Sequence, residues 1–181
     1  MKKAAAFGMT TQYYNRSKLS EELGGGARYV SFDELLATSD VLSLNLPLNV
    51  STRLAERKNR VRIVIDEQQK QTRHIISTHE FEKMKKGVII VNTSRGAVMD
   101  EEALVAALNS GQVSSCGLDV FEEEPKVHPG LIANPHVMLL PHMGTWSVET
   151  QKKMEVWCIE NVRSALETGR LKSPVGEQRD M

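Results

Sequence analysis

Cysteine is scarce in this chain, and aromatic residues and long hydrophobic runs are scarce as well. Cys116 and Cys158 have no metal-ligand or disulfide-framework spacing, which predicts two inert thiols in a reducing compartment. No stretch approaches the ~18 consecutive apolar residues that would predict a membrane span. Polar residues at 10–20 stand where a secretory signal would be apolar. We therefore expect a soluble, cytoplasmic protein with no membrane partner.

Net charge is also absent. The 23 Lys and Arg residues balance 23 Asp and Glu residues, so bulk electrostatics do not attract the chain to nucleic acid, and we expect no such partner. What the chain does have is 181 residues, of which 40% are hydrophobic. This length and composition favour one globular domain with a real core, or one domain with part of another, over two complete domains.

The hydrophobic pattern predicts an α/β fold, because short apolar runs alternate with segments whose apolar residues recur every three or four positions. We predict strands at Val41–Leu46, Gly87–Asn92, Ser114–Val120 and Val137–Pro141, with weaker candidates at Thr11–Tyr14 and Arg28–Val30. Helices are predicted at Ser31–Ala37, Thr78–Met84, Glu101–Asn109 and Val148–Thr168. Asp100 is expected to cap the third helix, with Gly111 after its end. The apolar run at 88–91 predicts strands that are covered on both faces.

Residues 50–71 interrupt this alternation. The segment is strongly basic and far longer than the roughly 2–6 residues that usually connect a strand to a helix, which predicts an insert. Within it, Val61–Asp66 alternates like an edge strand. One interpretation of the whole segment is a solvated excursion without function.

Three polar clusters follow predicted strands, at the edge where open α/β sheets bind ligands. They are Asn92-Thr93-Ser94-Arg95-Gly96, the acidic turn within 117–125, and Pro141-His142-Met143-Gly144-Thr145. Singly, each has a structural interpretation: an ion pair for the arginine, a solvated turn for the glutamates, and surface or packing roles for lone histidines such as His74, His79, His128 and His136. Together, an arginine, a carboxylate and a histidine at one sheet edge predict a site for carbonyl chemistry.

The order of these motifs resembles the D-isomer-specific 2-hydroxyacid dehydrogenases, and within them the fungal reductases of glyoxylate and hydroxypyruvate. The resemblance covers nearly the whole chain outside the insert and rests on Thr93-Ser94-Arg95-Gly96, Gly117-Leu118-Asp119-Val120-Phe121 with a Glu-Pro pair, and Pro141-His142-Met143-Gly144. It implies a Rossmann-like, doubly wound parallel sheet and hydride transfer between NAD(P)H and a small 2-oxo acid substrate. For the complete protein it implies a homodimer.

The resemblance also implies a role for each motif residue. Arg95 would bind the carboxylate and carbonyl oxygen of the substrate, His142 would donate the proton, and Glu124 would bond to the other imidazole nitrogen. No metal is expected in this site. The residues expected along the cofactor, with the aspartate on the nicotinamide carboxamide, are Pro47, Thr93, Ser94, Asp119 and Gly144.

The choice of cofactor is predicted from Tyr14-Asn15-Arg16-Ser17. NAD-specific relatives carry an acid at the end of this strand, which bonds to the ribose hydroxyls and repels a phosphate. Here Asn15 is neutral, and Arg16 and Ser17 follow it. The sequence therefore favours NADP, with NAD possible, unless Arg16 is only a solvated loop cation.

The resembled family's phosphate loop is missing. The sequence contains no Gly-x-Gly-x-x-Gly, and Gly24-Gly25-Gly26 is better explained as a turn. Met1–Met9 resembles the end of the helix that follows that loop, so we interpret 1–181 as a truncated nucleotide-binding domain whose first strand and glycine loop lie upstream. In a doubly wound sheet that strand is central, so we expect the first forty residues to pack worse than the rest.

Two further expectations depend on the resemblance. The segment 148–170 would return toward an absent substrate domain, which would leave its apolar face, including Trp157 and Ile159, without cover. Removing residues 50–71 restores a pattern close to that of the family, and the codons of Val50-Ser51 and Gln71 can resemble splice sites, so a second interpretation of the insert is a translated intron. A spliced transcript that keeps the segment in frame would exclude this second interpretation.

Two classes of function stay open. The first is a fragment of a 2-oxo acid reductase, which we expect to have negligible activity alone. The second is a non-catalytic binding or dimerisation module of the same superfamily, although an intact set of Arg95, Glu124 and His142 argues against it. A formate dehydrogenase is a weaker alternative, because that resemblance would lead us to expect glutamine in place of Glu124.

Overall fold

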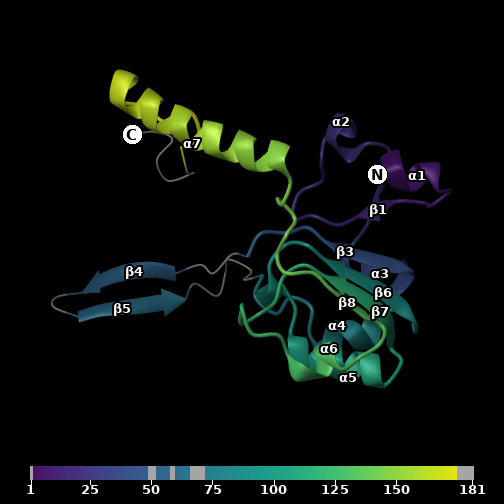
Figure 1. Ribbon diagram of the computed structural model, residues 1–181. Helices are drawn as coiled ribbons and strands as arrows, with labels where there is room; N and C mark the ends of the chain where they lie inside the picture. The colour runs from purple at the N-terminus through teal and green to yellow at the C-terminus, as the bar shows by residue number, and fades with distance from the viewer. Residues whose placement is uncertain (1, 49–51, 58–59, 66–71, 175–181) are drawn as a thin grey trace. The chain divides into compact units, whose positions relative to one another are not determined.

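The structure of the protein is a computed structural model (Figure 1). It describes residues 2–48, 52–57, 60–65 and 72–174. The chain divides into two compact units, Met1–His142 and Met143–Met181, and each is described by itself.

Parallel strands organise the first unit. A four-stranded sheet has the order β3 (Val41–Leu44), β6 (Val88–Asn92), β7 (Val113–Leu118) and β8 (Val137–Leu139). A separate parallel pair joins β1 (Gln12–Tyr13) to β2 (Arg28–Tyr29). Among the described residues, no strand pairing joins the two sheets. The predicted α/β fold with an incomplete parallel sheet is therefore confirmed.

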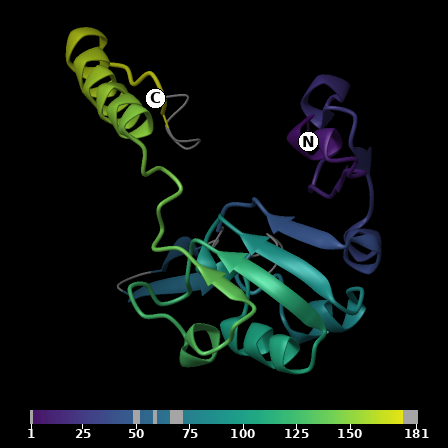
Figure 2. The same ribbon diagram turned by 45° about the vertical axis from the view of Figure 1, so that its right-hand side comes forward.

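The helices of the first unit are α1 (Lys2–Ala6), α2 (Glu21–Gly24), α3 (Phe32–Thr38), α4 (Thr78–Lys83), α5 (Glu101–Asn109) and α6 (Pro129–Ile132), with a 3-10 turn η1 (Gly96–Val98). The bounds predicted for α5 are confirmed: Asp100 Oδ1 accepts the N–H of Ala103 at 3.0 Å, and Gly111 follows the helix with a φ of 72°. Figures 1 and 2 show α5 and α6 on the same face of the four-stranded sheet.

The hydrophobic core lies between this sheet and its helices. Ile90 of β6, Leu104 of α5 and Val98 of η1 are completely buried in one cluster. The first forty residues add Leu36 to that cluster, with Phe32 and Leu35 packed partly against it. The predicted weaker packing of the N-terminal part is confirmed within the described residues.

The opposite face of the sheet is open, which corrects one expectation. Val41, Ile89 and Met138 are 38%, 39% and 66% exposed, and along β6 buried residues alternate with exposed or half-buried ones. The prediction that these strands are covered on both faces is therefore wrong for the described chain. An unbroken apolar run does not tell whether the second covering layer is present.

The segment predicted to be an insert lies partly outside the described residues, which omit 49–51, 58–59 and 66–71. Its described parts are β4 (Thr52–Arg57) and β5 (Arg60–Ile65), an antiparallel hairpin that includes most of the predicted edge strand. Thr72 Oγ1 donates to the carbonyl oxygen of Pro47 at 2.8 Å, so the chain resumes where it departed. This contact fits an insert, whose origin stays a hypothesis.

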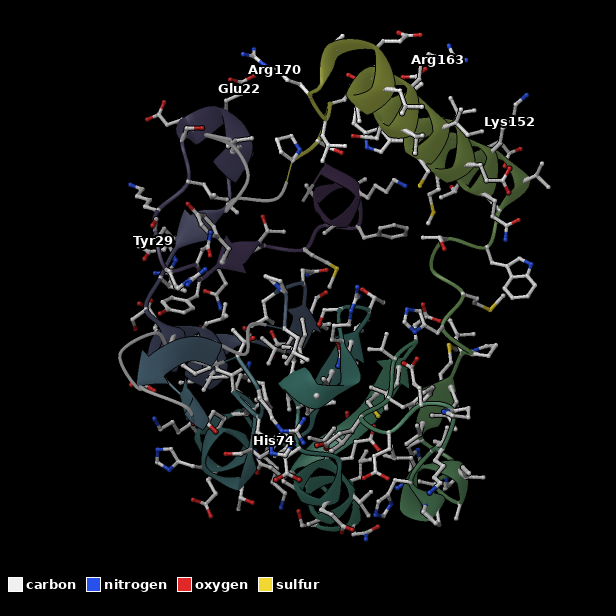
Figure 3. All side chains as sticks on the ribbon, turned by 90° about the vertical axis from the view of Figure 1, so that its left-hand side faces the viewer. Glu22, Tyr29, His74, Lys152, Arg163 and Arg170 are labelled. Carbon is white, nitrogen blue, oxygen red and sulfur yellow. The ribbon has the colours of Figure 1, made fainter. Side chains whose placement is uncertain are left out.

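The second unit is built on α7 (Val148–Thr168), whose predicted bounds are confirmed. Ser147 Oγ accepts the N–H of Thr150 at 3.2 Å, and Gly169 ends the helix with a φ of 71°. The helix buries none of its residues, and Trp157 and Ile159 are about half exposed, as expected. Side chains such as Lys152 and Arg163 extend away from it (Figure 3). None of the helices in the described residues is long and apolar enough to cross a membrane.

Candidate active site

The loop after β6 is shaped by Asn92. This residue is completely buried, and its Oδ1 accepts hydrogen bonds from the N–H of Ser94 at 3.0 Å and from Ser94 Oγ at 2.9 Å. Its Nδ2 donates to the carbonyl oxygen of Arg95 at 3.2 Å. Asn92 therefore folds the loop back on itself and fixes the backbone that carries Arg95. Sequence reasoning gave Asn92 no role, although a polar residue at an inward position of an apolar strand is a signal for one.

Gly96 lets this loop touch the next one. A Cβ atom at Gly96 would lie 1.9 Å from the carbonyl carbon of Phe121, closer than any side chain tolerates. The loop after β6 and the acidic turn after β7 therefore make backbone contact, which only glycine permits. This contact sets the distance between Arg95 and the turn that carries Glu124.

Four of the predicted residues line one pocket of about 480 Å³ at the carboxyl ends of β3 and β6. They are Pro47, Thr93, Ser94 and Arg95. Arg95 is exposed and donates from Nη1 to the carbonyl oxygen of Ser94 at 2.7 Å, and within the described residues it pairs with no carboxylate. Its remaining N–H groups are thus available to an anionic ligand.

Glu124 and His142 form the hydrogen bond that the sequence leads us to expect. Nδ1 of His142 lies 2.8 Å from Oε2 of Glu124, while Oε1 accepts the N–H of Phe121 at 3.0 Å. The bond from His142, then that from Phe121, and also the charge of Arg95 hold the pKa of Glu124 below its ordinary value. An ionised carboxylate only accepts, so the proton lies on Nδ1, and Nε2 is left for a ligand.

Asp119 lies at the carboxyl end of β7, next to Asn92. It is 5% exposed, and its N–H donates to the carbonyl oxygen of Asn92 at 3.0 Å. A buried carboxylate at a sheet edge is consistent with the predicted contact to a cofactor amide. Gly144 belongs to the second unit, in a turn closed by the N–H of Trp146 on the carbonyl oxygen of Met143 at 2.9 Å.

The predicted cofactor loop, Asn15-Arg16-Ser17, follows β1. Asn15 Oδ1 accepts the N–H of Arg16 at 3.0 Å, and the Tyr29 hydroxyl donates to the carbonyl oxygen of Asn15 at 3.0 Å. Arg16 itself is exposed and, among the described residues, has no carboxylate partner. The loop is therefore held by its backbone, with its cation free to bind an anion.

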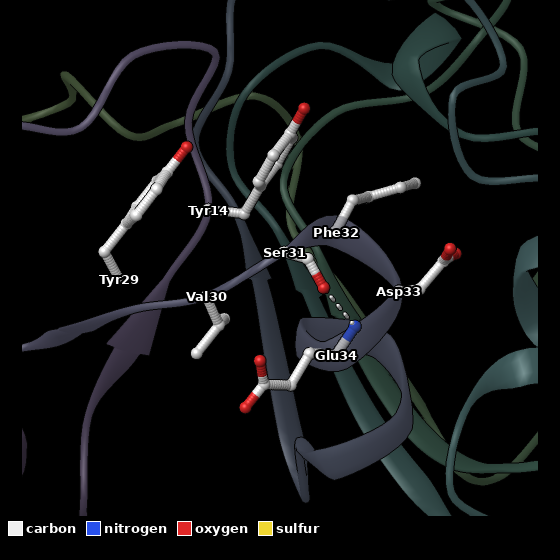
Figure 4. Close-up of a pocket in the computed structure, with 7 residues that line it drawn as sticks. All are labelled: Tyr14, Tyr29, Val30, Ser31, Phe32, Asp33 and Glu34. Carbon is white, nitrogen blue, oxygen red and sulfur yellow. Dashed lines mark hydrogen bonds between the residues drawn. The ribbon is translucent and has the colours of Figure 1, made fainter.

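A second pocket, of about 580 Å³, lies beside this loop and was not predicted. Its lining includes Tyr14, Tyr29, Asp33 and Glu34, and both tyrosine hydroxyls point the same way (Figure 4). The two acids are neutralised by cations outside the pocket: Lys83 lies 2.7 Å from Asp33 and Arg28 lies 3.0 Å from Glu34. The two acids therefore repel an anion in this pocket less than two unpaired carboxylates would.

Neither cysteine takes part in this site. Cys116 is buried in β7, and burial raises the pKa of its thiol to about 11, which fits the predicted inertness of this residue. Cys158 is exposed on α7. In the described part of the chain, no group of histidine, cysteine and acidic side chains could hold a metal ion.

Comparison with known proteins gives a consistent family. The model of the NAD binding domain of D-isomer specific 2-hydroxyacid dehydrogenases matches residues 1–64 and 58–144. The chain is 56% identical to 4-methyl-2-oxopentanoate reductase A of Aspergillus oryzae, covering 99% of this chain and 48% of that one. It is 45% identical to glyoxylate reductase 1 of Saccharomyces cerevisiae, over 91% of this chain and 41% of the relative. The chain thus spans about half the length of these relatives or less.

Comparison with solved structures agrees with this family assignment. A glyoxylate reductase from Paecilomyes thermophila superposes with a TM-score of 0.85 at 55% identity, covering 98% of this chain and 48% of that one. An NADPH-dependent glyoxylate/hydroxypyruvate reductase from Sinorhizobium meliloti, in complex with NADP and malonate, superposes with a TM-score of 0.81 at 28% identity, over 97% of this chain and 48% of that one.

Proposed function

Because the chain belongs to the D-isomer specific 2-hydroxyacid dehydrogenase family, we propose that it is part of an oxidoreductase that reduces small 2-oxo acids of the glyoxylate and hydroxypyruvate class. The observation that carries the proposal is the 2.8 Å hydrogen bond between His142 Nδ1 and Glu124 Oε2, beside an arginine with no protein carboxylate partner in the described chain. A binding module without catalysis would not need this pair.

Each of the three side chains meets a need of carbonyl reduction. Negative charge develops on the keto oxygen as the carbonyl carbon is reduced, and Nε2 of protonated His142 supplies the proton that neutralises it. Glu124 holds the ring in the required tautomer through Nδ1. Arg95 binds the substrate carboxylate and stabilises the oxygen charge. General acid catalysis of this kind contributes about 10²–10⁴-fold to a rate.

A nicotinamide coenzyme would supply the hydride when bound, and the residues present fit its two ends. Asp119, Thr93, Ser94 and Pro47 are proposed to hold the nicotinamide half, and the role predicted for Gly144, which belongs to the second unit, stays a prediction. Asn15, Arg16 and Ser17 are proposed to hold the ribose of the other half, with the exposed Arg16 on a ribose phosphate. This supports a preference for NADP, with NAD as the less favoured coenzyme. The sequence contributes no glycine fingerprint for the pyrophosphate between them.

We also propose that these 181 residues alone have negligible activity, because they hold the two ends of the coenzyme without a phosphate cradle. Each 1.4 kcal/mol of lost binding lowers affinity about tenfold. The complete protein is proposed to be a cytoplasmic homodimer. Purified chain mixed with NADPH and glyoxylate should show no loss of absorbance at the NADPH band above a protein-free control, and measurable turnover would contradict this expectation.

The substrate site is tested by binding rather than turnover. Oxalate, a planar dicarboxylate that resembles a 2-oxo acid, should shift the amide NMR signals of the loop after β6. Arg95→Gln should weaken the binding of oxalate at least about tenfold, since it removes a charge-assisted contact. Arg163→Gln, on the exposed face of α7, is the matched control and should bind as the unmodified chain does. Equal oxalate affinity in the Arg95 variant would contradict the proposed role of Arg95 in binding the substrate carboxylate.

Cofactor preference is tested with two nucleotide fragments. We expect 2′,5′-ADP to bind more tightly than 5′-AMP, and Arg16→Gln to remove that difference, because one cation beside a phosphate at an effective dielectric of 20 is worth up to about 4 kcal/mol. Lys18→Gln is the neighbouring control. Tighter binding of 5′-AMP by the unmodified chain would reverse the proposed preference for NADP.

A further inference from the structure

A second cluster of titratable groups includes Glu122, two positions before Glu124 in the chain, and the proposed chemistry does not use it. Its centre is His74, labelled in Figure 3, whose Nε2 lies within hydrogen-bond distance, 2.6 Å, of Oε1 of Glu122. Arg73 Nη2 donates to the same oxygen. On the other side of the ring, Nδ1 lies 3.8 Å from Oδ2 of Asp100, the residue that caps α5. Sequence reasoning gave His74 only a surface or packing role.

The backbone of His74 is fixed as tightly as its ring. Its φ is 50°, in the left-handed region, which a residue other than glycine adopts only where its surroundings impose the conformation. The N–H of His74 donates to the carbonyl oxygen of Ala97 at 2.9 Å. Ala97 follows Gly96 in η1, so His74 is attached directly to the loop that carries Arg95.

Both the side chain and the backbone of Glu122 make polar contacts with neighbouring residues. Its side chain is 16% exposed, and its N–H donates to Oε1 of Glu101 at 2.6 Å. Glu101 is itself 8% exposed at the start of α5. The preceding residue, Phe121, has its carbonyl group against Gly96. Phe121 and Glu122 are therefore clamped between η1, α5 and the segment that contains His74.

Glu124 has no comparable support of its own. Its side chain is 36% exposed and that of His142 is 49% exposed, so little packing fixes their orientation. The carboxylate reaches His142 only while the turn places it there, with Oε1 on the N–H of Phe121. Whatever holds Phe121 and Glu122 consequently sets the position of Glu124.

We propose that His74 and Glu122 are positioning residues that clamp the acidic turn so that Glu124 meets His142 in the geometry required for proton transfer. This role rests on the proposed function of the pair. The clamp connects the Arg95 loop, through Ala97 and His74, to the Glu124 turn, through Glu122. It thereby keeps the cation and the acid–base pair in register on one edge of the sheet.

The test is the pKa of Glu124, measured from its side-chain carboxyl ¹³C signal in the 181-residue chain, which needs neither coenzyme nor turnover. Unmodified protein should titrate below the ordinary glutamate value. Glu122→Gln should raise the midpoint by about half a pH unit, as expected for partial loss of an exposed ion pair. Glu123→Gln is the matched control, because this neighbour is exposed and has no ion pair within the described residues; its midpoint should not move.

A second variant protects the test against unfolding. His74→Asn keeps a residue that tolerates positive φ but is too short to reach Glu122, and it should raise the Glu124 midpoint as Glu122→Gln does. Unchanged midpoints in both folded variants would overturn the clamp while leaving the proposed function intact. An ordinary midpoint in the unmodified chain would mean that the pair is not formed, and would count against both.

Discussion

The two parallel sheets of the first unit differ in nearly every respect. The four-stranded sheet is backed by a continuous core, and its carboxyl edge carries the pocket at Arg95 and the hydrogen bond between Glu124 and His142. The β1–β2 pair has two residues in each strand and carries the proposed coenzyme loop. The proposed substrate end of the site is thus built on packed structure, whereas the proposed coenzyme end depends on a strand pair that, within the described residues, is not joined to the main sheet.

The largest effect that we expect is in the packed region, at the contact between its two loops. Gly96→Ala would place a methyl group on the backbone of Phe121, so the loop or the turn must move. We expect a loss of more than about 4 kcal/mol in the free energy of unfolding, measured with urea. Gly117→Ala is the control, because its Cβ would meet no atom within 4 Å. Similar stability of the two variants would contradict the close approach.

Two leucines of the N-terminal part test where the packed core ends. Leu36 is completely buried in the main core, whereas Leu23 is 69% exposed. Leu36→Ala should cost about 3 kcal/mol in the free energy of unfolding, and Leu23→Ala less than about 0.5 kcal/mol. Equal costs would show that α2 and α3 belong to one cooperative structure, which would contradict a difference in packing between them.

A smaller effect distinguishes two glutamates at the site through pH. The lowered pKa of Glu124 stabilises the fold above the ordinary glutamate value of about 4.5, and this contribution is lost as pH falls through the lower, folded-state pKa. Burial raises the pKa of Glu101, so its ionisation weakens the fold as pH rises from the ordinary value through the folded-state one. The two contributions therefore change with pH in opposite directions.

The measurement is the free energy of unfolding of two variants between acid and neutral pH. Glu124→Gln should lower the free energy of unfolding by about 0.5 kcal/mol near neutrality, a small change because the pair is exposed. In acid the substitution should not change it. Glu101→Gln keeps an acceptor for the N–H of Glu122 and should gain stability relative to unmodified protein as pH rises. Parallel pH dependence of both variants would contradict this assignment.

Long helices could be predicted from the sequence with their bounds, whereas the short helices α6 and η1 could not. The predicted bounds of α5 and α7 match because each has a capping side chain before it and a glycine after it. The short α6 and the η1 turn have too few residues to show a helical period. In the four-stranded sheet, β3, β7 and β8 end earlier than predicted, because their last predicted residues already belong to the loops that follow, whereas β6 ends at Asn92 as predicted.

The candidate site was predictable where its residues form motifs, as for Arg95, Glu124 and His142. It was not predictable where a role depends on tertiary contact. Asn92 and His74 acquire their partners only when β6, β7 and the chain after the insert come together. No local pattern reports such contacts, because they join positions that are distant in sequence.

Amide hydrogen exchange of the intact chain, resolved by NMR, compares the two sheets most directly. We predict strong protection at Ile90 and Cys116, in the centre of the four-stranded sheet, and weak protection at Tyr13 and Val30, at the strand pair. Such a difference would support a proposed substrate site on a sheet that stays folded without support from the N-terminal strands. Uniform protection across both sheets, or rapid exchange in β6 and β7, would contradict the account.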